Sequence, residues 1–207
     1  MGLADRISLR SRRRKFGLFM ETMAPTEETT VLDVGVDDFA FGEQSVNEGS
    51  CGTLNFFEEM YPWPAQLTAV GQHEGERFRA SYPDASYVRA DALQLPFEDG
   101  TFDIVFSNAV IEHVGGEEQQ RRFVAEALRV GTRAFITTPN RWFPVEVHTR
   151  LPLVHWLPNG VSHRAYDLVR KPWAKENRLL GPRSLARLFP GHVRIVNLGL
   201  TLVAVVD

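Results

Sequence analysis

The chain has 207 residues, of which 43% are hydrophobic and 24% are charged, and it carries a formal net charge of −3. This length suits one folded domain, and the composition excludes a disordered, collagen-like or low-complexity chain. The single cysteine, Cys51, excludes an internal disulfide framework and a four-cysteine zinc site, and it fits a reducing compartment. No apolar run is long enough to cross a bilayer and no secretory signal is recognisable, so we expect a cytoplasmic protein.

The N-terminal segment, residues 1–24, predicts a basic amphipathic helix. Residues 12–15 are all basic, and the apolar residues that follow share one helical face: Phe16, Phe19, Met20 and Met23. Such a stripe usually packs against its own domain, but a basic amphipathic helix can also lie on an anionic membrane. We expect residues 1–24 to form an arm beside the main domain, residues 25–207. A peripheral membrane contact through residues 6–23 stays open.

Strands and helices alternate after residue 25. Short apolar or β-branched segments predict strands at residues 30–36, 66–71, 86–91, 101–108 and 133–138, with helices at 55–61, 74–81, 117–130 and 182–189. The last two strands, 192–197 and 200–206, are too close in sequence for a crossover and must be antiparallel neighbours. The pattern predicts an α/β fold: a Rossmann-like, seven-stranded, mostly parallel sheet with an antiparallel last strand and helices on both faces.

Ligands of such sheets bind at the carboxyl ends of the strands. The residues found there are Asp33, Gly35 and Asp37 after the first strand, Gln72 and Glu74 after the second, Asp91 and Ala92 after the third, and Ser107 and Asn108 at the end of the fourth. Acids and amides without lysine suit hydroxyl groups and the exocyclic amine of adenine better than phosphate. Neither a P-loop nor a G-x-G-x-x-G motif is present, which argues against an NTPase and a nicotinamide-dependent enzyme.

Two segments, VLDVG and ADALQLPFEDGTFDIVFSNAVIEHV (residues 90–114), resemble class I methyltransferases that use S-adenosylmethionine, of the small-molecule "type 11" kind. The resemblance extends from about residue 30 to the end of the chain. It implies that Asp91 binds the adenine amine and that the backbone of Ala92 reaches the ring. It also implies that the loop from residue 33 to 37 lies under the methionine and ribose, and that Ser107 and Asn108 face the methyl donor.

The chain departs from that family at two positions. The loop after the first strand contains one glycine, Gly35, where the family usually has G-x-G-x-G, and glycines allow backbone to approach a ligand closely. The acid that usually holds the ribose hydroxyls after the second strand is not evident, and Gln72, His73 and Glu74 compete for that role, which Glu74 could fill and Gln72 could fill more weakly. Both departures predict modest cofactor affinity.

Residues 139–181 interrupt the alternation and contain three of the four tryptophans: Trp142, Trp156 and Trp173. A long insertion rich in aromatic residues predicts a lid on the substrate side, although a small satellite core is the alternative. His113 and His148 are candidate proton acceptors, and Glu146 shares a face with His148 if the segment is extended. We predict no metal site, because Glu112, His113, Glu146 and His148 lack tight ligand spacing.

The sequence therefore predicts an S-adenosylmethionine-dependent methyltransferase that acts on oxygen or nitrogen of a small-molecule or lipid-like acceptor. Two alternatives stay open. One is a methyltransferase-like binding protein that has lost catalysis, and the other is a membrane-surface adaptor. A nucleic-acid substrate is not expected, because residues 16–131 contain 21 acidic and six basic residues. The sequence does not indicate an oligomeric state.

Overall fold

The computed structural model describes residues 3–38 and 55–207, with side chains described from residue 9 onward. The strands are β1 (Val31–Val34), β2 (Leu67–Gly71), β3 (Ser86–Arg89), β4 (Phe102–Asn108), β5 (Gly131–Pro139), β6 (Arg194–Asn197) and β7 (Thr201–Val206). The helices are α1 (Leu3–Met23), α2 (Phe56–Met60), α3 (Glu76–Ser81), α4 (Glu117–Val130), α5 (Asn159–Leu168) and α6 (Pro182–Ala186). Within these ranges, no helix is both long and apolar enough to span a bilayer.

The seven strands form one sheet in the order β3-β2-β1-β4-β5-β7-β6. The first five strands are parallel, and β7 runs antiparallel to both β5 and β6, as the sequence predicted. The chain first builds outward from β1 to β3 and then returns to add β4 on the other side of β1. The carboxyl ends of β1 and β4 therefore border the switch point where sheets of this kind bind ligands.

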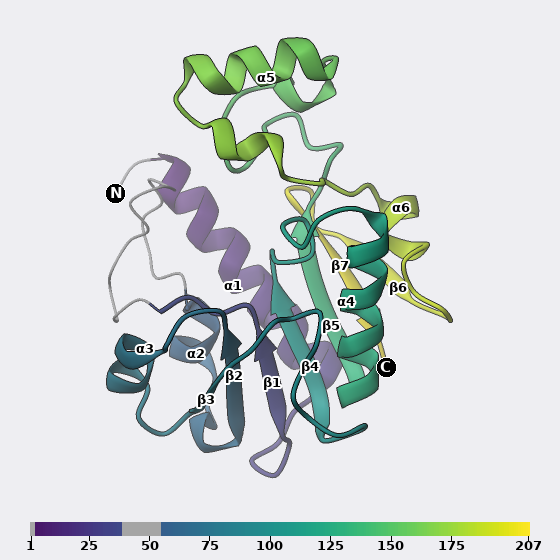
Figure 1. Ribbon diagram of the computed structural model, residues 1–207. Coiled ribbons are helices and arrows are strands. Elements are labelled where there is room, and N and C mark those ends of the chain that lie inside the picture. The colour runs from purple at the N-terminus through teal and green to yellow at the C-terminus, as the bar shows by residue number, and fades with distance from the viewer. Residues whose placement is uncertain (1–2, 39–54) are drawn as a thin grey trace.

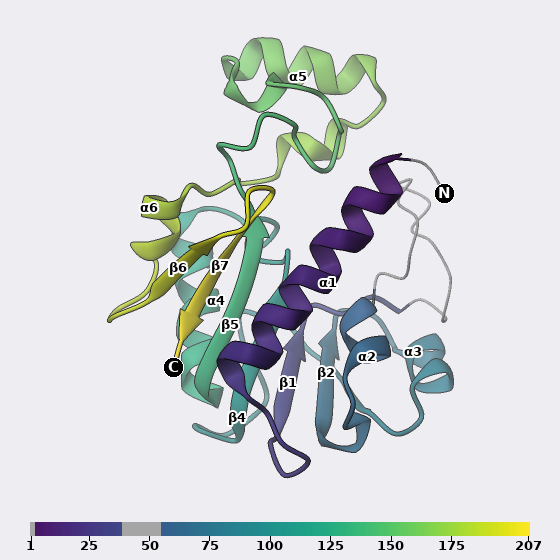
Figure 2. The same cartoon turned by 180° about the vertical axis from the view of Figure 1, so that it is seen from behind.

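Helices cover both faces of the sheet (Figures 1 and 2). One face packs against α4 and α6, with Phe123 and Leu185 fully or almost fully buried. The other face packs against α1, α2 and α3, with Phe57 and Phe78 buried in a second apolar cluster. Strands buried on both faces explain why their sequences are almost continuously apolar.

Helix α1 packs into this second cluster. Phe19 and Met23 are completely buried. The ring of Phe19 makes edge contacts with Phe57 at 5.0 Å and with Phe106 and Phe135 at 5.4 Å, measured between centroids. The apolar stripe predicted from the sequence therefore packs on its own domain, which was the first of the two interpretations, and α1 crosses the sheet face in front of β1, β4 and β5 in Figure 2.

The chain between β5 and α6 extends past the carboxyl ends of the strands (Figure 1). It contains α5 and two short 3₁₀ helices, Val154–Trp156 and Pro172–Lys175, which pack together around Val154, Tyr166 and Ala174. Trp173 joins this small core, as the alternative interpretation of the tryptophans proposed. The sequence does not predict α5, because its first residues, Asn-Gly-Val, are poor helix formers and packing stabilises the helix instead.

Candidate active site

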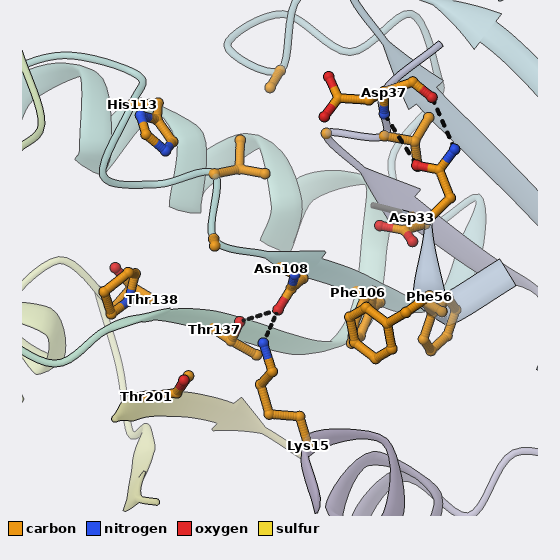
Figure 3. Close-up of a pocket in the computed structure, with 18 of the residues that line it drawn as sticks. Lys15, Asp33, Asp37, Phe56, Phe106, Asn108, His113, Thr137, Thr138 and Thr201 are labelled. Atoms are coloured by element: carbon orange, nitrogen blue, oxygen red, sulfur yellow. Dashed lines mark hydrogen bonds between the residues drawn. The ribbon is translucent and has the colours of Figure 1, made fainter. Parts of the chain in front are cut away.

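A cavity of about 970 Å³ opens at the carboxyl edge of the sheet. Its walls come from the loops after the parallel strands, from α1 and α2, and from the segment after β5 (Figure 3). The predicted site residues that line it are Asp33, Gly35, Asp37, Gln72, Asp91, Ala92, Asn108, His113 and His148. Three other predicted residues, Glu74, Ser107 and Glu146, are not among its described lining residues.

One glycine and one side-chain clamp fix the conformation of the loop after β1. Gly35 adopts a φ of +99°, and a Cβ there would lie 2.1 Å from a methyl carbon of Val110, so only glycine fits. The side chain of Asn55 then holds the backbone of Asp37 from both sides (Figure 3): its Nδ2 donates to the Asp37 carbonyl at 2.9 Å, and its Oδ1 accepts from the Asp37 amide at 3.3 Å. A side-chain clamp thus orders a loop in which the sequence shows one glycine.

Asp33, at the end of β1, forms a buried carboxyl pair with Glu58 of α2. Burial, then the charge and hydrogen bond of Glu58, raises the pKa of Asp33 well above its usual range. Burial also raises the pKa of Glu58 to about 7, against the hydrogen bond from Asp33, which lowers it. The pair therefore holds at least one proton near neutral pH. Oε1 of Glu58 is buried and has no hydrogen-bond partner among the described residues, so this wall of the cavity suits a cationic ligand group.

The ends of β2 and β3 lie side by side. Oδ1 of Asp91 accepts a hydrogen bond from the backbone amide of Leu93 at 2.9 Å, which orients its carboxylate at the cavity wall. Glu74 forms an ion pair with Arg89, and both side chains are largely exposed. Of the three candidates for the ribose hydroxyls, Gln72 and His73 line the cavity, and Glu74 does not.

Asn108, at the end of β4, is oriented by two donors (Figure 3). Its Oδ1 accepts from Nζ of Lys15 at 2.5 Å and from the hydroxyl of Thr137 at 2.9 Å. Lys15 is almost fully buried, and burial followed by the charge of Arg12 lowers its pKa to about 8, against the opposing charge of Glu112. Ser107 is different, because its hydroxyl is fully buried and donates to the carbonyl of Val34 at 2.9 Å, so it joins two strands.

Two histidines and two buried acids lie together where the turn after β4 meets the segment after β5. Nδ1 of His148 lies 2.7 Å from Oε1 of Glu146, whose other oxygen accepts the backbone amide of Thr149 at 2.6 Å. Burial would raise the pKa of Glu146, but hydrogen bonds from His148 and Thr149 and the charge of His148 outweigh it and bring the pKa to about 2. The predicted contact between the two side chains is present, although a turn creates it and not an extended segment. Nε2 of His113 and Nε2 of His148 each lie 3.9 Å from Oε1 of Glu112.

Sequence reasoning missed Lys15, Asn55 and Glu58 as cavity residues. Lys15 carried a usable signal, because it lies three residues after Arg12 and four before Phe19, on the face of α1 that meets the domain. The other two residues precede or begin a short helix and show their role only through contacts with β1. The segment after β5 contributes Phe143 to the cavity, whereas Trp142, which was expected to cover the site, is 62% exposed.

Fold and site together define a Rossmann-like α/β protein with an acid-lined cavity at the switch point of its sheet. The family model described as "Methyltransferase domain" matches residues 48–133. Over these residues the sequence thus resembles a methyltransferase domain, and the fold of the chain is the Rossmann-like fold of a solved S-adenosylmethionine-dependent methyltransferase.

Curated methyltransferases are similar to part of this chain. The chain is 27% identical over 158 residues to a ubiquinone biosynthesis O-methyltransferase of Rhizobium leguminosarum bv. trifolii, covering 75% of this chain and 59% of that protein. It is 26% identical over 132 residues to a probable S-adenosylmethionine-dependent methyltransferase of Mycobacterium tuberculosis, covering 56% of this chain and 48% of that protein. The matched region thus spans only about half to three fifths of the length of these relatives.

Solved structures show the same fold at low sequence identity. A protein of Pyrococcus horikoshii superposes with a TM-score of 0.56 at 16% identity, covering 95% of this chain and 89% of that one. An S-adenosylmethionine-dependent methyltransferase of Methanosarcina mazei gives a TM-score of 0.53 at 13% identity, covering 90% and 95%. A [4+2]-cyclase also matches, with a TM-score of 0.54 at 15% identity, covering 88% and 58%. The reaction must therefore be argued from the site and not from the fold.

Proposed function

We propose that this protein transfers the methyl group of S-adenosylmethionine to an oxygen or nitrogen atom of a small-molecule or lipid-like acceptor. The proposal rests on one observation: the ends of β1, β3 and β4 line one side of the cavity, and two histidines line the opposite side of the same cavity. The first part suits an adenosine and a sulfonium, and the second suits an acceptor that loses a proton.

The described residues fit the cofactor by their chemistry. Asp91 and the backbone of Ala92 would hold the adenine, and Gln72 and Asp37 would hold ribose hydroxyls, because carboxylates and amides accept hydrogen bonds from hydroxyls and amines. The buried pair of Asp33 and Glu58 offers a cation one oxygen, Oε1 of Glu58, that has no partner among the described residues. What the cofactor supplies when bound is a methyl group already activated on a sulfonium.

The chain itself then has to align the acceptor, exclude water and remove a proton. Phe143 and Val145 line the cavity after β5 and cover the acceptor side, so the segment 139–181 acts as a lid over the edge of the sheet. Asn108 is held in one orientation by Lys15 and Thr137 at the point where the family places the methyl donor. We assign the acceptor's proton to the histidine pair, with His148 or His113 accepting it and Glu146 fixing the His148 ring.

The surface of the lid supports a lipid-like acceptor and a peripheral contact with a membrane. Its large exposed apolar residues are Trp142, Val145, Leu153, Trp156, Leu157, Val161, Leu168 and Val169. Exposed Arg150, Arg164 and Arg170 lie in the same segment, and apolar groups beside basic groups suit the surface of an anionic bilayer. Helix α1 contributes exposed basic residues such as Arg13 and Arg14, while its apolar stripe is buried in the domain.

A transfer assay with methyl-labelled S-adenosylmethionine tests the proposal. The full chain is incubated with phenols, catechols, carboxylic acids, amines and an alkylated phenol in micelles. We expect label on at least one oxygen or nitrogen acceptor. His148→Ala should lower turnover by about 10²–10⁴-fold with little change in cofactor affinity, and the exposed His192→Ala is the matched control. Tight cofactor binding without transfer to any acceptor class would instead favour a binding protein that has lost catalysis.

A further inference from the structure

Three potential metal ligands meet on the acceptor side of the cavity. Glu112 and His113 lie in the turn after β4, and His148 comes from the segment after β5, 35 residues further along the chain than His113. One carboxylate oxygen and two imidazole nitrogens from these residues lie within 4.8 Å of one another. The spacing of these residues in the sequence argued against a metal site, but the sheet brings the two parts of the chain together.

Glu112 has an unsatisfied buried oxygen in the centre of the cluster. The residue is completely buried, and its Oε2 accepts a hydrogen bond from the hydroxyl of Thr138 at 3.0 Å. Its Oε1 has no hydrogen-bond partner among the described residues and lies 3.9 Å from Nε2 of both histidines. A buried carboxylate oxygen without a partner is unfavourable, and a cation in front of it would satisfy it.

The support around His148 is typical of a metal ligand. Its Nδ1 contacts Oε1 of Glu146 at 2.7 Å, which places the proton on Nδ1 and leaves the lone pair of Nε2 facing Glu112. Glu146 is in turn fixed by the backbone amides of His148 and Thr149. A carboxylate that orients an imidazole in this way is a recurrent partner of metal-binding histidines.

We infer that Glu112, His113 and His148 bind one divalent transition-metal ion, such as Mn²⁺, Fe²⁺ or Zn²⁺, with open positions toward the cavity. Two imidazoles and one carboxylate are the donors that such ions select. Ligand atoms about 2.1 Å from one ion lie about 3.0–3.4 Å apart in octahedral or tetrahedral geometry, so each 3.9 Å separation has to shorten by roughly 0.5–0.9 Å when the ion binds. The side chain of His113 is 42% exposed and therefore has space to move toward Glu112, while Glu146 holds the ring of His148.

A role of this ion in the reaction rests on the proposed function. His113, His148 and Thr138 line the cavity, and Figure 3 shows His113 and Thr138 at the same end of it, so an acceptor hydroxyl could occupy an open position of the ion. The bound hydroxyl loses its proton to water more easily. Its oxygen then forms the new bond to the methyl carbon while the sulfur–carbon bond breaks and the electron pair stays on sulfur. The loaded site uses both histidines as ligands, and the ion takes over the task assigned above to an imidazole base.

A Mn²⁺ titration of the full chain, stripped with a chelator and dialysed, tests the site by electron paramagnetic resonance of free Mn²⁺. We expect one ion per chain and a rise in melting temperature on binding. His148→Ala and His113→Ala should abolish saturable binding, and His192→Ala should leave it unchanged. Glu112→Gln should also abolish saturable binding. If this substitution at a buried position prevents folding, His113→Ala still tests the site, because the His113 side chain is half-exposed.

Absence of saturable binding, or equal binding by wild type and both histidine variants, would overturn the inference. The same samples, titrated with S-adenosylmethionine in the absence of Mn²⁺, keep the two proposals apart. Ion binding without any methyl transfer supports the site and contradicts the proposed function. If the protein shows no saturable Mn²⁺ binding and still transfers methyl groups at an unchanged rate after treatment with a chelator, the site is refuted and the proposed function stands.

Discussion

The buried carboxyl pair of Asp33 and Glu58 can be tested through its effect on stability. An ionised carboxylate in this buried wall should lower the free energy of unfolding, although the same negative charge suits a cationic ligand. The pKa of Glu58 is raised from 4.5 to about 7 by burial. The folded protein therefore keeps a proton that the unfolded chain loses between about pH 4.5 and 7. The free energy of unfolding should be highest below this range and should fall as the pH rises through it.

Glu58→Gln removes the ionisable group and keeps the shape of the side chain. At about 1.4 kcal/mol per pKa unit, the raised pKa corresponds to roughly 3 kcal/mol of stability lost by the wild type at pH 8. We expect the variant to be more stable than wild type by roughly 1–3 kcal/mol at pH 8 and about equal to it at pH 4.5. Its affinity for S-adenosylmethionine should fall at the same time, because the cavity loses a carboxylate that faces a cation.

Urea unfolding at both pH values measures the first effect, and calorimetric titration of the cofactor measures the second. Glu59→Gln is the matched control. Glu59 is the next residue and its side chain is exposed, so this substitution should change the free energy of unfolding by less than about 0.5 kcal/mol. The variant should keep the part of the fall that comes from Asp33, whose pKa burial also raises. If Glu58→Gln is no more stable than wild type at pH 8, or if its fall in stability with pH is as large as that of wild type, the reasoning about the pair is wrong.

Three further perturbations address other parts of the structure. Asp91→Ala should weaken cofactor binding by roughly 1–3 kcal/mol in calorimetry, and an unchanged affinity would remove its assigned contact with adenine. Phe19→Ala should lower the free energy of unfolding by roughly 3–5 kcal/mol, because the ring is completely buried among aromatic residues; a near-neutral result would mean that α1 is not part of the core. Lys15→Met should alter the pH profile of turnover around pH 8, where the wild-type ammonium loses the proton that it donates to Asn108. Profiles that coincide would show that this lysine does not influence the methyl-donor side.

The helices and strands could be predicted where short-range sequence patterns determine them. The buried strand β4 and the helix α4, whose observed bounds Glu117–Val130 equal the predicted ones, follow from apolar runs, helical periodicity and a terminal glycine. The short link between β6 and β7 fixed their antiparallel pairing. Each of these features depends on neighbours in sequence.

The site was predicted less completely because its contacts join distant parts of the chain. Lys15 meets Asn108 across 93 positions, and Glu74 is drawn to Arg89 across 15. The single-glycine loop is a similar case: its shape depends on Asn55 and on the close approach of Val110, and neither is visible in a motif. Strand ends indicated where polar groups gather, while the packing of α1 and α2 decided which of them face the cavity.

Calorimetric titration of S-adenosylmethionine into the full chain tests the central claim most directly. The cavity predicts saturable binding of one cofactor per chain, weakened by Asp91→Ala and by Glu58→Gln but not by Glu59→Gln. No saturable heat, or binding that is equal in all four proteins, would contradict the assignment of this cavity to the methyl donor.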